Sequence, residues 1–87
     1  MKLETAYAKL FKHWHWWQIL IQFDPDDMPR ITATLRDSSD WPSSVDVPSQ
    51  ITIWRRGLAN AMYAAAVEIE KRNRVVDLHK EIMAVEL

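Results

Sequence analysis

The sequence predicts a small α+β domain, in which a short N-terminal helix precedes an antiparallel β-hairpin and one long or bent C-terminal helix pair packs on the sheet. Two stretches predict the hairpin: residues 14–23 carry no formal charge and alternate from Trp17 onward, and residues 30–36 alternate polar and apolar side chains. A third stretch, residues 51–72, contains five alanines and no proline, which favours a helix.

Residues 3–12 are good helix formers with Leu3, Tyr7 and Leu10 on one side, so they predict the short N-terminal helix. A rival interpretation extends this helix to residue 21, because Trp14, Trp17 and Ile21 continue the same spacing of four and three. The hairpin is favoured because the alternating segment 30–36 needs a partner strand and residues 24–29 are rich in turn formers. We therefore expect strands at 15–23 and 30–37.

The even-numbered face of the first strand mixes large apolar groups with amides. It carries Trp14, Trp16, Gln18, Leu20 and Gln22. Such a face is neither a dry core nor an ordinary solvated surface, and if left open it is an aggregation hazard. We expect that either a helix of the same chain or another molecule covers it.

Residues 38–48 form a loop rich in serine, proline and aspartate, within a single domain that spans residues 1–87. Trp41 lies in this loop, where its ring either pins the loop to the core or serves as an anchor for a partner. Beyond the loop, Ser49 is a candidate N-cap for a long helix. We expect this helix to bend near Asn73 and to continue as a second helix over 75–87, with an unbroken helix from residue 49 to about residue 85 as the alternative.

The predicted long helix carries small side chains at four-residue intervals: Gly57, Ala61 and Ala65. A ridge of small residues allows another element to approach closely, and the bulky tryptophans are the expected cover. Helices packed on one face also support a hairpin that is marginal by itself. Pairing of edge strands between subunits is a second way to stabilise the hairpin. Because symmetric dimers are the commonest oligomers, we expect a homodimer.

Composition excludes several kinds of site. The chain of 87 residues has no cysteine and one glycine, so it offers no disulfide framework, no thiolate metal site and no phosphate-cradling glycine loop. We expect no cofactor, no metal and no enzymatic activity. The N-terminus lacks an apolar signal segment and no uncharged run is long enough to span a bilayer, so we expect a cytoplasmic protein with no membrane partner.

Nucleic-acid binding is the main alternative function. Residues 47–56 resemble the start of a recognition helix in helix-turn-helix regulators, although the serine- and proline-rich segment before them lacks the preceding helix. The resemblance implies that Ser49, Gln50 and Thr52 face base edges, and that Arg55 and Arg56 contact phosphates. The net charge of −1 does not favour binding of a polyanion.

By elimination, the sequence favours a non-enzymatic protein-binding module, an inhibitor or adaptor that occupies a partner's surface; an accessory subunit of an enzyme is a further alternative. By analogy, small inhibitors of this kind are typical of phages and other mobile elements. The predicted partner-binding residues are Trp14, Trp16, Gln18, Leu20, Asp24, Asp26, Asp27 and Trp41. If the target binds nucleic acid, the aspartates imitate phosphates.

Overall fold

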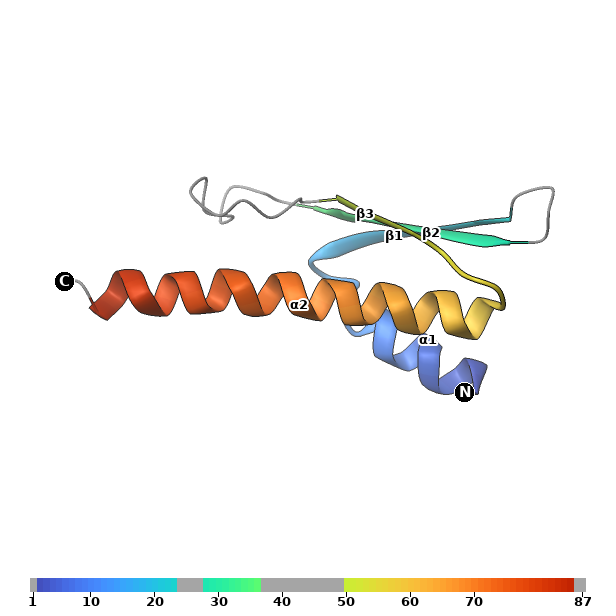
Figure 1. Ribbon diagram of the computed structural model, residues 1–87, viewed down its shortest axis with the longest axis horizontal. Helices are drawn as coiled ribbons and strands as arrows, with labels where there is room; N and C mark the ends of the chain where they lie inside the picture. The colour runs from blue at the N-terminus through green and yellow to red at the C-terminus, as the bar shows by residue number, and fades with distance from the viewer. Residues whose placement is uncertain (1, 24–27, 37–49, 86–87) are drawn as a thin grey trace.

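The computed structural model confirms the α+β class and describes residues 2–23, 28–36 and 50–85. Its elements follow in the order α1 (Leu3–Phe11), β1 (Trp17–Phe23), β2 (Pro29–Leu35), β3 (Gln50–Trp54) and α2 (Leu58–Val85). The three strands form one antiparallel sheet in the order β1-β2-β3. Both helices lie on the same side of this sheet, with α2 next to it and α1 packed against α2 (Figure 1).

The predicted hairpin is confirmed, and the rival helix over residues 3–21 is wrong. α1 ends at Phe11 with a cap at Lys12, and residues 12–16 turn the chain into β1. In the hairpin Ile19 lies opposite Ala33 and Ile21 opposite Ile31. The hairpin prevails because it gives the alternating residues of β2 a partner and buries the apolar face of both strands.

A third strand lies where the sequence predicted the start of the long helix. Gln50–Trp54 pairs with β2, and Ile51 and Ile53 are buried on the side of the sheet that faces the helices. Pairing with β2 and burial of Ile51 and Ile53 therefore decide their structure, and their β-branched side chains fit a strand. The predicted N-cap, Ser49, lies outside the described residues.

The long helix begins at Leu58, and Gly57 lies before it in a left-handed conformation with φ of 81°. This conformation favours glycine, so Gly57 is a turn residue and not the first member of a small-residue ridge. The Ala61 N–H donates to the Gly57 carbonyl at 3.0 Å, and the Asn60 side chain donates to the Arg56 carbonyl at 3.1 Å. These two bonds join the turn to the helix start.

The predicted bend near Asn73 is wrong, because α2 is one continuous helix of 28 residues. Asn73 lies within it, and its Oδ1 accepts a hydrogen bond from the buried Trp17 indole Nε1–H at 3.4 Å. The predicted pair of C-terminal helices is therefore a single helix, and the helix pairing in this fold is between α1 and α2. At about 1.5 Å per residue α2 is about 42 Å long, so it extends well beyond the sheet (Figure 1).

The core lies between the sheet and the two helices. Ala61, Ala65 and Ala66 of α2 are fully buried, which confirms the small-residue ridge apart from Gly57. The largest fully buried side chains come from four different elements: Trp17, Leu10, Ile31 and Ile69. The tryptophan-rich segment is thus divided, because Trp17 enters the core while Trp14 and Trp16 stay exposed.

Candidate functional site

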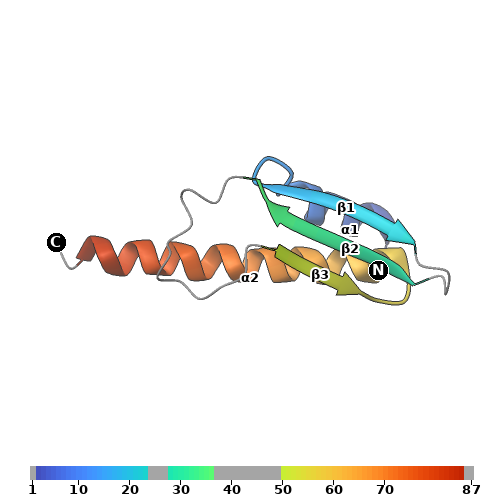
Figure 2. The same cartoon turned by 90° about the horizontal axis from the view of Figure 1, so that it is seen from above.

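The face of the sheet that points away from the helices, here called the outer face, is the candidate site. Strand register arranges its side chains in three rows across β1, β2 and β3. The rows are Gln18–Thr34–Gln50, Leu20–Thr32–Thr52 and Gln22–Arg30–Trp54. Seen from above, the outer face is not covered by either helix (Figure 2). Among its described residues no side chain is a carboxylate.

Large apolar side chains are exposed among these amides and hydroxyls. Trp16 is 67% exposed, Leu20 50% and Trp54 45%. Trp16 lies in the turn that leads into β1, and its carbonyl accepts the Arg36 N–H at 2.9 Å, so its backbone extends the pairing of β1 with β2 by one residue. Exposed indole rings in a polar surround are typical of protein-binding surfaces, where tryptophan and arginine contribute most of the affinity.

Two arginines of the outer face are held by neighbouring groups. Arg30 Nε donates to Gln22 Oε1 at 3.1 Å, and the Arg30 Nη2 group donates to the same oxygen. The Arg36 guanidinium lies 4.4 Å from the centroid of the Trp14 ring, and its Nε donates to the Trp14 carbonyl at 2.9 Å. Both cations are therefore oriented before any partner arrives, which lowers the entropy lost on binding.

A row of stacked aromatic rings connects the Arg36 guanidinium to α1. Tyr7 stacks on Phe11 at 4.4 Å between ring centroids, and Phe11 stacks on Trp14 at 5.9 Å. Arg36 also contacts the Trp14 ring, so these four side chains form a chain of contacts from α1 to the end of β2. These contacts fix the turn at residues 12–16, so they position Trp16 at the corner of the outer face.

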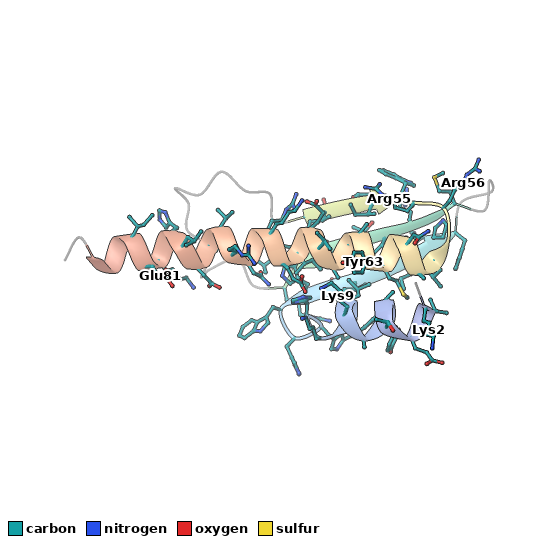
Figure 3. The ribbon with its side chains drawn as sticks, turned by 60° about the horizontal axis from the view of Figure 1, so that its bottom comes forward. Lys2, Lys9, Arg55, Arg56, Tyr63 and Glu81 are labelled. Carbon is teal, nitrogen blue, oxygen red and sulfur yellow. The ribbon has the colours of Figure 1, made fainter. Side chains whose placement is uncertain are left out.

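A second polar cluster, here called the Glu70 cluster, joins the two helices. Lys9 Nζ lies 3.1 Å from Glu70 Oε2, Lys12 Nζ lies 3.2 Å from Oε1, and His13 Nε2 lies 3.5 Å from Oε1. Lys9 also lies 5.5 Å from the Tyr63 ring centroid, between α1 and α2 (Figure 3). The cluster holds α1 on α2, and it borders an open pocket of about 370 Å³ lined by His13 and by residues of α2 from Glu70 to Glu81.

Burial and charge act in opposite directions on this cluster. Burial raises the pKa of Glu70, but the hydrogen bonds from Lys9 and Lys12, the charge of Lys9 and the contact with His13 together outweigh burial and leave the pKa below its ordinary value. For His13, burial lowers the pKa and outweighs the opposing effect of Glu70. The distance of 3.5 Å from His13 Nε2 to Glu70 is too long for a good hydrogen bond, and among the described residues this nitrogen has no other acceptor or donor. The imidazole therefore favours its neutral form.

The structure brings together residues that the sequence assigned to two different functions. Gln18 and Leu20, predicted to bind a protein, share rows of the outer face with Gln50 and Thr52, predicted to bind nucleic acid. Trp16 pairs with Arg36 next to these rows, and the Arg36 guanidinium lies over the Trp14 ring. The predicted recognition helix is wrong, because these residues form β3 and their side chains point from a sheet.

Several predicted site residues cannot be placed. Asp24, Asp26, Asp27, Trp41 and Ser49 lie outside the described residues. Arg55 and Arg56 follow β3, and Arg56 extends away from the body of the molecule (Figure 3). Sequence reasoning missed Trp54 and Arg30 as members of the face, and the signal for Trp54 was the alternation of residues 50–54.

The C-terminal half of α2 carries a second exposed apolar surface. It consists of the exposed side chains of Val75, Leu78 and Ile82. Figure 1 shows that the C-terminal part of α2 extends past the sheet. This surface is separate from the outer face. It offers matched positions for control substitutions, since its side chains are exposed to a similar degree.

No protein-family model, curated protein or solved structure matches this chain. Within residues 2–23, 28–36 and 50–85, no group of three or more histidine, aspartate or glutamate side chains is placed to hold a metal ion. In the same part of the chain, no helix is both long enough and apolar enough to cross a bilayer. The site therefore has to be interpreted from its own chemistry.

Proposed function

We propose that this chain binds another protein through the outer face of its sheet and acts as an inhibitor or adaptor. The observation that carries the proposal is the exposure of Trp16, Leu20 and Trp54 across a face that otherwise consists of amides, hydroxyls and arginines. Large rings with few rotatable bonds bury much apolar area at a small entropic cost, which is why they anchor protein interfaces.

Charge defines the chemistry of the partner. Arg30 and Arg36 are the charged side chains on the described part of this face, and Arg55 follows β3 directly. A protein surface that supplies carboxylates around an apolar hollow is complementary to both the arginines and the indoles. The glutamines and threonines donate and accept hydrogen bonds at the rim, where they add specificity.

Nucleic acid is the alternative occupant, because glutamine and arginine also contact base edges and phosphates. The charge of the whole chain opposes it: residues 24–48 carry six aspartates against two arginines, and the net charge is −1. Binding of nucleic acid also requires a steep dependence of affinity on salt. The experiment below separates the two occupants.

The test is capture of a partner from nuclease-treated lysate by the immobilised chain, followed by titration with the purified partner. The double substitution Trp16→Ser with Trp54→Ser should weaken binding at least tenfold, about 1.4 kcal/mol. The matched control, Leu78→Ser with Ile82→Ser on α2, should leave affinity unchanged. Equal affinity of the Trp16/Trp54 variant, or capture that disappears after nuclease treatment, would refute the proposal.

A further inference from the structure

β1 has a sequence that reads nearly the same in both directions. Its residues are WQILIQF, a palindrome about Leu20 apart from the two aromatic ends, Trp17 and Phe23. The strand carries no charge and no proline. Natural proteins usually protect a long edge strand with charges, proline or a bulge, because unpaired backbone groups recruit another strand.

The backbone of β1 presents such groups at its open edge. The backbone groups of the even-numbered residues point toward β2, as the hydrogen bond from the Arg36 N–H to the Trp16 carbonyl shows. The Trp17 N–H points in the opposite direction and donates to the His13 carbonyl at 2.9 Å. In an antiparallel ladder the direction alternates along the strand. The N–H and C=O groups of Ile19 and Ile21 therefore point away from β2, where the sheet order places no further described strand.

We propose that β1 pairs antiparallel with β1 of a second copy of this chain, about a two-fold axis that passes through Leu20. In this register Leu20 lies beside the partner's Leu20, Gln18 beside the partner's Gln22, and Ile19 beside the partner's Ile21. Each Ile19–Ile21 pair exchanges two backbone hydrogen bonds. The palindrome makes the strand its own best partner, as a two-fold interface requires.

The register also keeps each face of the sheet uniform. A two-fold axis centred on a residue pairs even positions with even and odd with odd, so the outer face continues as an outer face. The apolar side with Ile19 and Ile21 likewise continues as an apolar side. A shift by one residue would set apolar side chains of one copy beside glutamines of the other, so a one-residue shift is disfavoured.

Exposed apolar side chains also occur on α1 and at the end of β1. Leu3 and Tyr7 of α1 are 49% and 53% exposed, and Phe23 at the end of β1 is 65% exposed. α1 lies beneath β1 when the sheet is seen from above (Figure 2). In the dimer the two α1 helices come together under the joined sheet, and Phe23 lies opposite the partner's Trp17, which is an aromatic cross-strand pair.

The other edge of the sheet is a weaker candidate. β3 has five residues against seven in β1, and Arg55 and Arg56 follow it directly. Short strands and nearby charges are the usual means of blocking an edge. The β1 dimer makes one six-stranded sheet with a single continuous outer face, in which the Leu20 side chains of both copies lie at the centre.

Sedimentation of the purified full chain tests this dimer without any partner. The wild type should have twice the 10.3 kDa mass of one chain. Leu20→Lys places two ammonium groups side by side at the two-fold axis and should yield a monomer. Thr52→Lys, on the outer face of β3, carries the same charge and should remain a dimer. A monomeric wild type, or a Thr52→Lys variant that dissociates while Leu20→Lys does not, would overturn the inference.

A cross-link gives an independent readout that does not depend on charge. The chain has no cysteine, so a Leu20→Cys variant can form one disulfide, to its partner. Residues at the two-fold axis form a non-hydrogen-bonded pair about 4.5 Å apart at Cα, which suits a disulfide. Leu20→Cys should cross-link on mild oxidation and Thr52→Cys should not, and the reverse pattern would refute pairing through β1.

The experiments can contradict the dimer without contradicting the proposed function, and the reverse. A monomeric wild type that still loses partner binding on substitution of Trp16 and Trp54 would remove the dimer alone. A dimer whose partner binding does not depend on these two tryptophans would remove the proposed function alone.

Discussion

Replacement of Ile31 by alanine tests the assignment of the two faces of the sheet. Ile31 is fully buried in the central strand, and Ile31→Ala removes three carbons. At about 0.8 kcal/mol per carbon the lost transfer free energy is about 2.4 kcal/mol, and the cavity left behind raises the total to about 3–4 kcal/mol. A chain of this size has a free energy of unfolding of roughly 4–13 kcal/mol, so the loss is a large part of it.

The matched control is Thr32→Ala, the next residue along β2, whose side chain lies on the outer face. Thr32→Ala should lower the free energy of unfolding by less than about 1 kcal/mol, because the change removes only the greater preference of threonine over alanine for a β-strand. Urea unfolding followed by far-ultraviolet circular dichroism measures both variants at one protein concentration, with linear extrapolation to water. Equal losses for Ile31→Ala and Thr32→Ala would refute the assignment of the faces.

Three further predictions concern α2 and its contacts. Ala65→Leu should destabilise the fold by about 1–3 kcal/mol through overpacking, whereas Ala64→Leu, at a half-buried site, should cost less in the same urea experiment. The wild type should lose stability as the pH falls below about 6.5, since the unfolded chain binds a proton before the half-buried His13 of the folded chain does. His13→Gln should reduce this loss between pH 7.5 and 5.5, and a wild type that gains stability in this range would contradict the argument. Asn73→Pro should lower stability by about 3 kcal/mol or more and reduce helical circular dichroism, because α2 is continuous there; an unchanged signal would indicate a break.

Residues that the sequence assigned to protein binding and to nucleic-acid binding lie together on the outer face. Gln50 and Thr52 were expected on a helix in a DNA groove, but β3 sets them beside the residues expected to contact a protein. The choice between protein and nucleic acid therefore depends on the apolar anchors and on the charge of the chain. Both favour a protein partner.

The α+β class, α1 and the hairpin could be predicted from the sequence because each depends on local periodicity. Apolar residues recur at helical spacing in residues 3–12 and at alternate positions in 17–23 and 30–36. These patterns specify which side chains need cover. They also predicted that Gln18 and Leu20 share the exposed face of β1, opposite its apolar face, and that Trp16 next to the strand is exposed.

Only the tertiary structure decided the secondary structure of residues 50–54 and of the segment around Asn73. Gln50–Trp54 is five residues long, too short for periodicity to overrule the helical pattern that follows it. It becomes a strand because β2 offers unpaired backbone groups on its second edge, and residues distant in sequence supply that edge. Asn73 is a common helix stop, yet it lies inside the continuous helix α2, where its side chain accepts a hydrogen bond from the buried Trp17 indole, 56 positions earlier in the chain.

The amino-acid order by itself determined which faces are apolar and where the chain turns, because periodicity is a property of neighbouring residues. The three-dimensional arrangement decided which faces meet, because burial and backbone pairing are settled between segments far apart in sequence. In this protein, periodicity indicates which residues are exposed, and the pairing of distant strands arranges them in the rows of the outer face.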